Sequence, residues 1–343
     1  MKRQLNYCQA ISEALVQGME AHANAFLFGL GVDDCRGIFA TTLEANRRFG
    51  PSRVFDVPAS ENALTGIAIG AALNGKHPIL VHARNDFMFL ALDQMVNNAA
   101  KWKYTYAGKS AVGMTVRAIV GKGWGQGPTH SQNLQAVFSH FPGLIVAAPS
   151  NAYDIKGLIL KSLTEKNPVV IIEHRSLYYL SMPVPEEIYH VEFGKARIWR
   201  EGKDLTIVAT SVMVPEALKA AQVLSGHGID IEVIDPVTIQ PLDEATILHS
   251  VQKTGRLICA DGDWLQCSFA SEVAARMADK AFHDLKAPIK RVGWPECPAA
   301  VSKTLEENFH PTHKNIIRAA LEILDKSISI PDADTKDTFV GPY

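Results

Sequence analysis

The stretch "VFDVPASENALTGIAIGAALNG", from Val54 to Gly75, joins a short apolar run to a helix that opens on a single carboxylate. Apolar residues recur at helical spacing after Ser60, at Leu64, Ile67, Ala68, Ala71 and Ala72. This spacing predicts a helix with a continuous apolar face. Ser60 is a plausible N-cap for it, and Pro58 favours an extended approach to it.

Glu61 is the one acidic residue of this helix, and two interpretations of it are open. It could simply face the positive end of the helix dipole, where acidic side chains are commonly found. It could instead serve the chemistry of a site. Gly66 and Gly70 stand four residues apart and leave a smooth stripe where another backbone could come close.

The length of 343 residues predicts two domains, because a single core rarely grows so large. The composition, 47% hydrophobic and 20% charged, is typical of a soluble globular protein. The 34 basic and 36 acidic side chains give a net charge of −2, and no basic tract stands out. We therefore expect neither nucleic acid nor a membrane as a partner.

Targeting signals are not expected. The first 22 residues contain no long apolar run, so neither a signal peptide nor a membrane anchor is predicted. No apolar run elsewhere approaches the ~20 residues that a transmembrane helix needs. The five cysteines are scattered and form no CxxC or zinc spacing, which is typical of reduced thiols in a cytoplasmic protein.

Apolar runs alternate with helical patterns along the chain. The first half contains "AFLFGLGV", "HPILVHA", "SAVGMTVRAIV", "GLIVAAPS" and "PVVIIEH", and the second contains "LTIVATS", "IDIEVIDP", "GRLICAD" and "IKRVGW". This alternation predicts an α/β fold with mostly parallel sheets covered by helices. We expect a first domain at 1–182, an irregular linker at 183–203, a second domain at 204–326 and a polar tail at 327–343.

Ligands of parallel-sheet enzymes bind beyond the carboxyl ends of strands, so we expect a site in the loops that follow the apolar runs. The loop "GKGWGQGPTHSQ", from Gly121 to Gln132, matches neither a P-loop nor a dinucleotide fingerprint. Its glycines would let the backbone approach a ligand closely. His130 ends this loop, before the helical pattern "SQNLQAVFSHF". It could be structural, or it could perform acid–base chemistry near neutral pH.

The segment "HARNDFMFLALDQMVNNAAKWKY" begins at His82 and holds two phenylalanines, Phe87 and Phe89, that could belong to the core. The polar neighbours Arg84, Asn85 and Asp86 favour a loop tip instead, where an exposed ring could pack on a planar ligand. No serine, cysteine or zinc catalytic set is apparent in the sequence.

In their order and spacing, several segments resemble a known family over nearly the whole chain. They include "FGPSRVFDVPASENALTGIAIGAALNGKHPI", "ALDQMVNNAAKW", "THSQ", "FPGLIVAAPSNAYDIKGLI", "VEFGKARIWREGKDLTIVATS", "VIDPVTIQPLD" and "LEENFHPTHKNII". The family is the β subunit of thiamine-diphosphate-dependent 2-oxoacid dehydrogenases (E1 components), within the transketolase superfamily. The resemblance implies a doubly wound pyrimidine-binding domain followed by a smaller α/β domain of the transketolase C-terminal type.

The resemblance also implies roles for individual residues. Glu61 would contact N1′ of the aminopyrimidine of thiamine diphosphate, and Phe87 would pack on that ring. His130 would face the substrate or the covalent intermediate. A structural potassium ion is implied as well, held mostly through backbone carbonyls of Met114, Ser162, Leu163, Glu165 and Asn167. Glu165 stands where the family more commonly has aspartate.

The superfamily binds the diphosphate through Mg²⁺ and a GDG motif followed by an Asn-Asn pair. The nearest string in this chain, "ADGDW" at 260–264, has a different order and no Asn-Asn pair after it. The resemblance therefore implies a separate α subunit that holds Mg²⁺ and the diphosphate. The assembly would be α₂β₂, with a second copy of this chain, and a lipoyl acyltransferase could be a further partner.

Two departures from the family leave open which compound accepts the unit formed from the substrate. Leu30 stands where an acidic residue is usual, and the loop from Arg84 to Asp86 is more polar than its aromatic-rich counterpart. The alternative to a dehydrogenase component is a carboligase or transketolase-like subunit that passes its unit to a carbonyl compound. A non-catalytic partner of the α subunit is a further alternative, against which the presence of Glu61, Phe87 and His130 argues. A dinucleotide-dependent dehydrogenase lacks its fingerprint.

Overall fold

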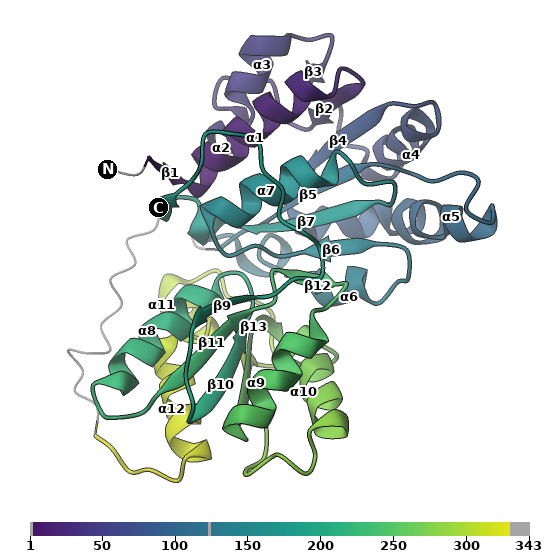
Figure 1. Ribbon diagram of the computed structural model, residues 1–343. Coiled ribbons are helices and arrows are strands. Elements are labelled where there is room, and N and C mark those ends of the chain that lie inside the picture. The colour runs from purple at the N-terminus through teal and green to yellow at the C-terminus, as the bar shows by residue number, and fades with distance from the viewer. Residues whose placement is uncertain (1–2, 123–124, 330–343) are drawn as a thin grey trace. The chain divides into compact units, whose positions relative to one another are not determined.

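The computed structural model describes residues 3–122 and 125–329, and the chain forms two compact units, each a sheet flanked by helices (Figure 1). Among the described residues, the first unit takes 3–122, 129–193 and 239–241. The second takes 125–128, 194–238 and 242–329. The expected tail lies outside the described residues from position 330 onward.

The first unit alternates strands and helices, as predicted from the apolar runs. Its strands are β1 (Gln4–Asn6), β2 (Ala25–Gly29), β3 (Val54–Phe55), β4 (His77–His82), β5 (Thr115–Val120), β6 (Ile145–Ala147), β7 (Val169–His174) and β8 (Ser181–Pro183), with β12 (Thr238–Gln240) at one sheet edge. Its helices are α1 (Tyr7–Ala21), α2 (Gly37–Ala40), α3 (Leu43–Phe49), α4 (Glu61–Leu73), α5 (Lys101–Thr105), α6 (Gln135–Ser139) and α7 (Ala152–Ser162), with the 3₁₀-helices η1 (Asn85–Ala91) and η4 (Arg175–Leu177) and the π-helix η2 (Gln94–Ala100). The 3₁₀-helix η3 (Gly127–Thr129) begins in residues of the second unit and ends in the first.

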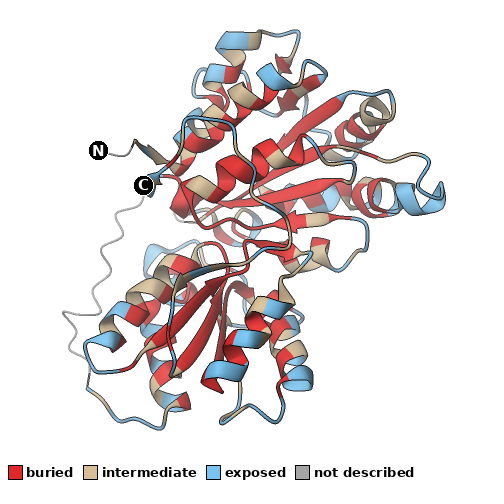
Figure 2. Cartoon of the chain, viewed as in Figure 1, coloured by how far each residue is buried: buried red, intermediate tan, exposed pale blue. Residues whose placement is uncertain are grey.

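The strand order of the larger sheet is β12-β6-β7-β5-β4-β2-β3, and the printed pairs from β6 to β3 are all parallel. Every residue of β4, β5 and β7 is buried, and Figure 2 shows these strands in red beneath helices. Burial on both faces explains why these strands are continuous apolar runs rather than alternating patterns. The mostly parallel sheet predicted from those runs is confirmed.

The second unit contains a five-stranded sheet of order β14-β13-β10-β11-β9. Its strands are β9 (Arg197–Arg200), β10 (Leu205–Ala209), β11 (Ile231–Asp235), β13 (Leu257–Trp264) and β14 (Lys290–Trp294). Its helices are α8 (Met213–Ser225), α9 (Glu244–Thr254), α10 (Phe269–Lys280), α11 (Lys303–Phe309) and α12 (His313–Ile323). The strands pair in parallel except β9, which is antiparallel to β11.

The structure differs from the sequence-based expectation in two segments. The segment expected to be an irregular linker contains β9, whose arginines and half-buried positions suit a sheet edge. The helix expected directly after His130 begins only at Gln135. The residues between them stay in a loop, in which Ser131 and Asn133 are buried.

Helix α4 begins at Glu61, as the spacing predicts. Ser60 occupies the N-cap position, but its side chain makes no capping hydrogen bond among the described residues. Leu64, Thr65, Ala68 and Ile69 are buried beneath the helix, which packs on β4 and η1. No helix of the described part of the chain combines the length and apolarity that a membrane crossing requires.

Candidate active site

The site begins at the carboxyl edge of the first sheet, where the loops after β4 and β5 leave neighbouring parallel strands. Phe87 lies on η1 after β4, and His130 lies in the loop after β5. Their rings meet edge to face, with centroids 5.5 Å apart and an interplanar angle of 87°. The structure therefore brings together two of the residues that sequence analysis singled out.

Hydrogen bonds across the two loops hold this pair in place. Asp86 Oδ1 accepts from Gln132 N at 3.0 Å and from Gln132 Nε2 at 3.1 Å. Asn85 Nδ2 donates to the carbonyl oxygen of Gln132 at 3.3 Å. Because Asp86 precedes Phe87 and Gln132 follows His130 by two residues, these bonds fix the spacing of the two rings.

The two rings differ in what they offer to a ligand. Phe87 is 38% exposed, as expected for a ring at a loop tip rather than in the core. His130 Nδ1 lies 2.9 Å from the hydroxyl of Thr129, a hydrogen-bond distance. The ring nitrogen left to face a substrate is therefore Nε2.

Glu61 is the first residue of α4 and is half-exposed. Its carboxylate makes no hydrogen bond or ion pair with any described residue, whereas its backbone carbonyl accepts from Thr65 Oγ1 at 2.8 Å. No described contact joins Glu61 to Phe87 or His130. The structure places Glu61 on a helix that packs against η1, the element that carries Phe87.

The residues expected to bind potassium lie at the opposite, amino edge of the sheet. Met114 precedes β5, and Ser162 to Asn167 connect α7 to β7. The Met114 carbonyl accepts from Val169 N at 2.9 Å, and the Ser162 carbonyl accepts from Glu165 N at 3.1 Å. Each carbonyl oxygen has a second lone pair, so this oxygen-only set suits a hard cation.

No group of three histidine, cysteine or acidic side chains that could hold a metal ion occurs within residues 3–122 and 125–329. The string "ADGDW" forms the end of β13, where Asp261 and Asp263 are buried. Asp261 accepts from Thr210 Oγ1 at 2.7 Å. Burial, together with the neighbouring Asp261, raises the pKa of Asp263 to about 8.

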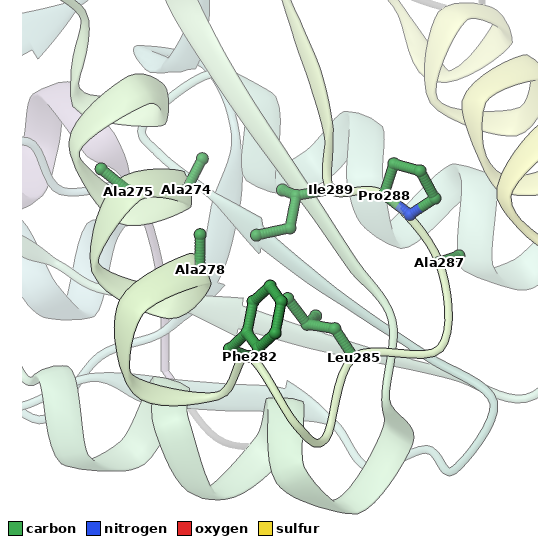
Figure 3. A pocket seen from close by; sticks show the side chains of 8 residues that line it. All are labelled: Ala274, Ala275, Ala278, Phe282, Leu285, Ala287, Pro288 and Ile289. Atoms are coloured by element: carbon green, nitrogen blue, oxygen red, sulfur yellow. The ribbon is translucent and has the colours of Figure 1, made fainter.

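An apolar pocket of about 560 Å³ lies in the second unit, between α10 and the segment that leads to β14 (Figure 3). Phe282, Leu285 and Ile289 line it together with alanines of α10. None of its lining residues can donate a proton, act as a nucleophile or bind a metal.

Sequence analysis missed the bonds that connect Asn85 and Asp86 to Gln132, although it noted that the first loop is unusually polar. It also missed the buried ion pair between Arg117 and Glu173, whose Nε and Oε1 atoms are 2.6 Å apart. Charged residues inside the apolar runs "TVRAIV" and "VVIIEH" were the available signal.

Comparison with known proteins agrees with this architecture. Residues 3–181 match the family model of the transketolase pyrimidine-binding domain, and residues 194–316 match that of the transketolase C-terminal domain. A solved structure of a split-gene transketolase, described as an inactive beta4 tetramer, has the same fold. Its TM-score is 0.76 at 22% identity, with 94% of this chain and 98% of that chain covered.

Two Bacillus subtilis (strain 168) proteins are relatives over nearly their whole length. The chain is 39% identical to the beta subunit of acetoin:2,6-dichlorophenolindophenol oxidoreductase, covering 94% of this chain and 98% of the relative. It is 36% identical to the beta subunit of the pyruvate dehydrogenase E1 component, covering 94% of this chain and 99% of that relative. The chain therefore belongs to the family of E1 β subunits of thiamine-diphosphate-dependent 2-oxoacid dehydrogenases, built from transketolase-type pyrimidine-binding and C-terminal domains.

Proposed function

We propose that this chain is the β subunit of an enzyme that decarboxylates a 2-oxoacid and transfers the resulting acyl unit to lipoamide, in complex with a separate α subunit. The observation that carries the proposal is the meeting of Phe87 and His130 at the carboxyl edge of the sheet. Family membership supplies the cofactor, thiamine diphosphate.

The residues present fit the aminopyrimidine part of that cofactor. A heteroaromatic ring with a protonatable nitrogen needs an apolar surface to pack on and a carboxylate to share a proton. Phe87 offers a partly exposed ring, and the Glu61 carboxylate has no partner within the described residues. When bound, thiamine diphosphate supplies the carbon nucleophile for the 2-oxo group, and the protein orients and tunes it.

Each side chain has a defined task in this proposal. Glu61 holds a proton at N1′ of the pyrimidine, and Phe87 packs against the ring and excludes water from it. His130 presents Nε2 to the substrate and holds or gives up a proton there, while the Thr129 hydroxyl fixes the orientation of the imidazole through Nδ1.

The α subunit supplies the diphosphate half of the site, with its Mg²⁺, in this proposal. The face of α4 that carries Ile67 is the proposed contact surface, because Ile67 is 60% exposed. A Cβ placed on Gly70 would meet no atom within 4 Å, and one on Gly66 would meet only Gln94. A helix of the α subunit could therefore approach α4 closely, in an assembly with two copies of each chain. A lipoyl acyltransferase is the proposed downstream partner.

We also propose a structural potassium ion at Met114, Ser162, Leu163, Glu165 and Asn167, held through carbonyl oxygens. The domain boundaries that we propose remain 1–182 and 204–326, joined by the segment 183–203, with a tail at 327–343. A cytoplasmic location is proposed from the scattered cysteines, which are all unpaired.

Turnover by the complex with the α subunit tests the proposal. Glu61→Ala should lower kcat with a 2-oxoacid by about 10²-fold or more, a loss typical of a positioned proton-transfer group. Glu44→Ala is the matched control, since Glu44 lies in the first turn of α3 and pairs with Arg47 on the surface. Unchanged turnover in Glu61→Ala would contradict the assignment.

The acceptor separates the two functions that sequence analysis left open. Reduction of lipoamide during 2-oxoacid turnover supports the dehydrogenase component. Consumption of an aldehyde without reduction of lipoamide would support the carboligase alternative instead.

A further inference from the structure

The carboxylate of Asp86 connects the loop that carries His130 to the 3₁₀-helix η1. One of its oxygens, Oδ1, accepts from the backbone N of Gln132 at 3.0 Å and from the side-chain Nε2 of the same residue at 3.1 Å. Asp86 is 6% exposed, so water competes little for these two bonds. Hydrogen bonds to an ionised carboxylate are also stronger than those between neutral groups. Asp86 therefore holds both the backbone and the side chain of Gln132.

The element that carries Asp86 is held in place independently of these bonds. The helix η1 packs against α4, β4 and β5, and its residues Met88 and Ala91 are fully buried. Phe87 lies on the same helix, directly after Asp86. We therefore expect η1, and Phe87 with it, to keep its position when the bonds to Gln132 are removed.

The segment on the other side of the bonds has less support. Residues 131–134 lie outside any helix or strand, between His130 and the start of α6 at Gln135. The His130 ring contacts its neighbour Thr129 and the Phe87 ring, and a single edge-to-face ring contact is weak. The position of His130 therefore depends on the bonds that hold Gln132, two residues further along the chain.

We propose that Asp86 is a positioning residue that acts through His130 and not through Phe87. Its carboxylate sets where Nε2 of the imidazole lies relative to the substrate, whereas the packing of η1 sets the surface offered to the cofactor ring. The inference rests on the proposed function, in which His130 faces the substrate. A displacement of about 1 Å in a group that takes part in the reaction can lower turnover by about 10²-fold.

Turnover and cofactor binding by the complex with the α subunit test the two halves of this proposal. The substrate is whichever of pyruvate, 2-oxobutyrate and 3-methyl-2-oxobutanoate is turned over fastest. Asp86→Ala should lower kcat by about 10²-fold. Isothermal titration with thiamine diphosphate and Mg²⁺ should give a Kd within about twofold of wild type, because Phe87 stays in place.

Two milder variants grade the effect and keep the test open if Asp86→Ala does not fold. Asp86→Asn retains an amide oxygen that can accept the same two bonds, so kcat should stay within about tenfold of wild type. Gln132→Ala removes only the bond from Nε2 and keeps the backbone donor. Its kcat should fall by about tenfold, less than that of Asp86→Ala.

A double-mutant cycle with His130 separates positioning from a merely structural role. In a His130→Ala background, Asp86→Ala or Gln132→Ala should lower kcat by no more than about twofold, because no imidazole is left to position. A variant that only weakened the fold would lower kcat again by its full factor.

Asp243→Ala is the matched control, because the Asp243 carboxylate also accepts from two backbone N atoms, of Ala196 at 3.0 Å and of Thr246 at 3.3 Å. All three residues belong to the second unit. This variant should leave kcat within about twofold of wild type. A large loss of kcat in Asp243→Ala would mean that any lost carboxylate contact lowers turnover, and would overturn the inference.

Three results would overturn the positioning role of Asp86 while the proposed function stands. They are wild-type kcat in both Asp86→Ala and Gln132→Ala, an undiminished loss in the His130→Ala background, and a Kd for thiamine diphosphate that rises in step with the loss of kcat. Wild-type kcat in His130→Ala, or a complex that turns over none of the three 2-oxoacids, would instead overturn the proposed function and this inference with it.

Discussion

Replacing Glu173 by glutamine should destabilise the first unit by about 3–5 kcal/mol. Glu173 and Arg117 lie on the neighbouring strands β7 and β5, and both side chains are fully buried. Glu173 Oε1 accepts from Arg117 Nε at 2.6 Å and Oε2 accepts from Arg117 Nη2 at 2.9 Å. Burial alone would lower the pKa of the Arg117 guanidinium, and the Glu173 carboxylate raises it above its ordinary value. In Glu173→Gln the buried guanidinium loses this counter-charge and only the unfavourable effect of burial remains.

The size of the stability loss in Glu173→Gln depends on the buried Arg117 charge that remains without a carboxylate partner. Breaking a buried pair costs about 3–5 kcal/mol, whereas replacing both partners with apolar groups of similar volume is often close to neutral. The double variant Arg117→Met/Glu173→Leu should therefore recover most of the loss. Tyr178→Phe removes only the hydroxyl that donates to Oε2 at 2.8 Å, so it should cost about 1–3 kcal/mol.

Differential scanning calorimetry of the purified chain measures these effects. A loss of 3–5 kcal/mol in a unit of this size corresponds to a fall in Tm of roughly 6–20 °C. A Glu173→Gln variant with a fall below about 2 °C would refute the reasoning. A double variant less stable than Glu173→Gln would refute it as well.

Three further predictions concern the subunit contact, pH dependence and potassium. Ile67→Glu should abolish co-purification with the α subunit yet leave the Tm of the isolated chain within about 2 °C, because Ile67 is 60% exposed. Asp263 keeps its proton in the folded chain up to a pH of about 8, whereas in the unfolded chain it releases the proton near pH 4. The contribution of Asp263 to the free energy of unfolding therefore declines as the pH rises from about 4 to about 8. Asp263→Asn should flatten this decline in a Tm series from pH 5 to 8.5, and an unchanged slope would contradict it. Replacing Na⁺ by K⁺ at equal ionic strength should raise the Tm, and equal Tm values would exclude the ion.

The buried strands were predictable because their apolar runs directly reflect burial on both faces. The strands that were missed are short or lie at edges, such as β8 and β9, where prolines and arginines interrupt the pattern. The left-handed backbone of Ile38, Phe39 and Ala40 was not predictable, because it uses no glycine at these positions. In this segment the centroid of the Phe39 ring lies 4.3 Å from the Arg175 guanidinium carbon, a contact between residues distant in sequence.

Some features of the candidate site were predictable from the sequence, and others were not. Family resemblance drew attention to Phe87 and His130, and the parallel order of β4 and β5 explains why they meet. The bonds between Asp86 and Gln132 join loops that are distant in sequence, and no local pattern encodes such a pair. Whether the buried oxygens of Asn85 and Asp86 are paired depends on what the fold places beside them.

Binding of thiamine diphosphate in the presence of Mg²⁺ tests the central claim most directly. Isothermal titration should detect tight binding only when this chain and its α subunit are combined, with Glu61→Ala weakening it, because each subunit holds one half of the cofactor. Tight, Mg²⁺-dependent binding by this chain alone, unaffected by Glu61→Ala, would contradict the account.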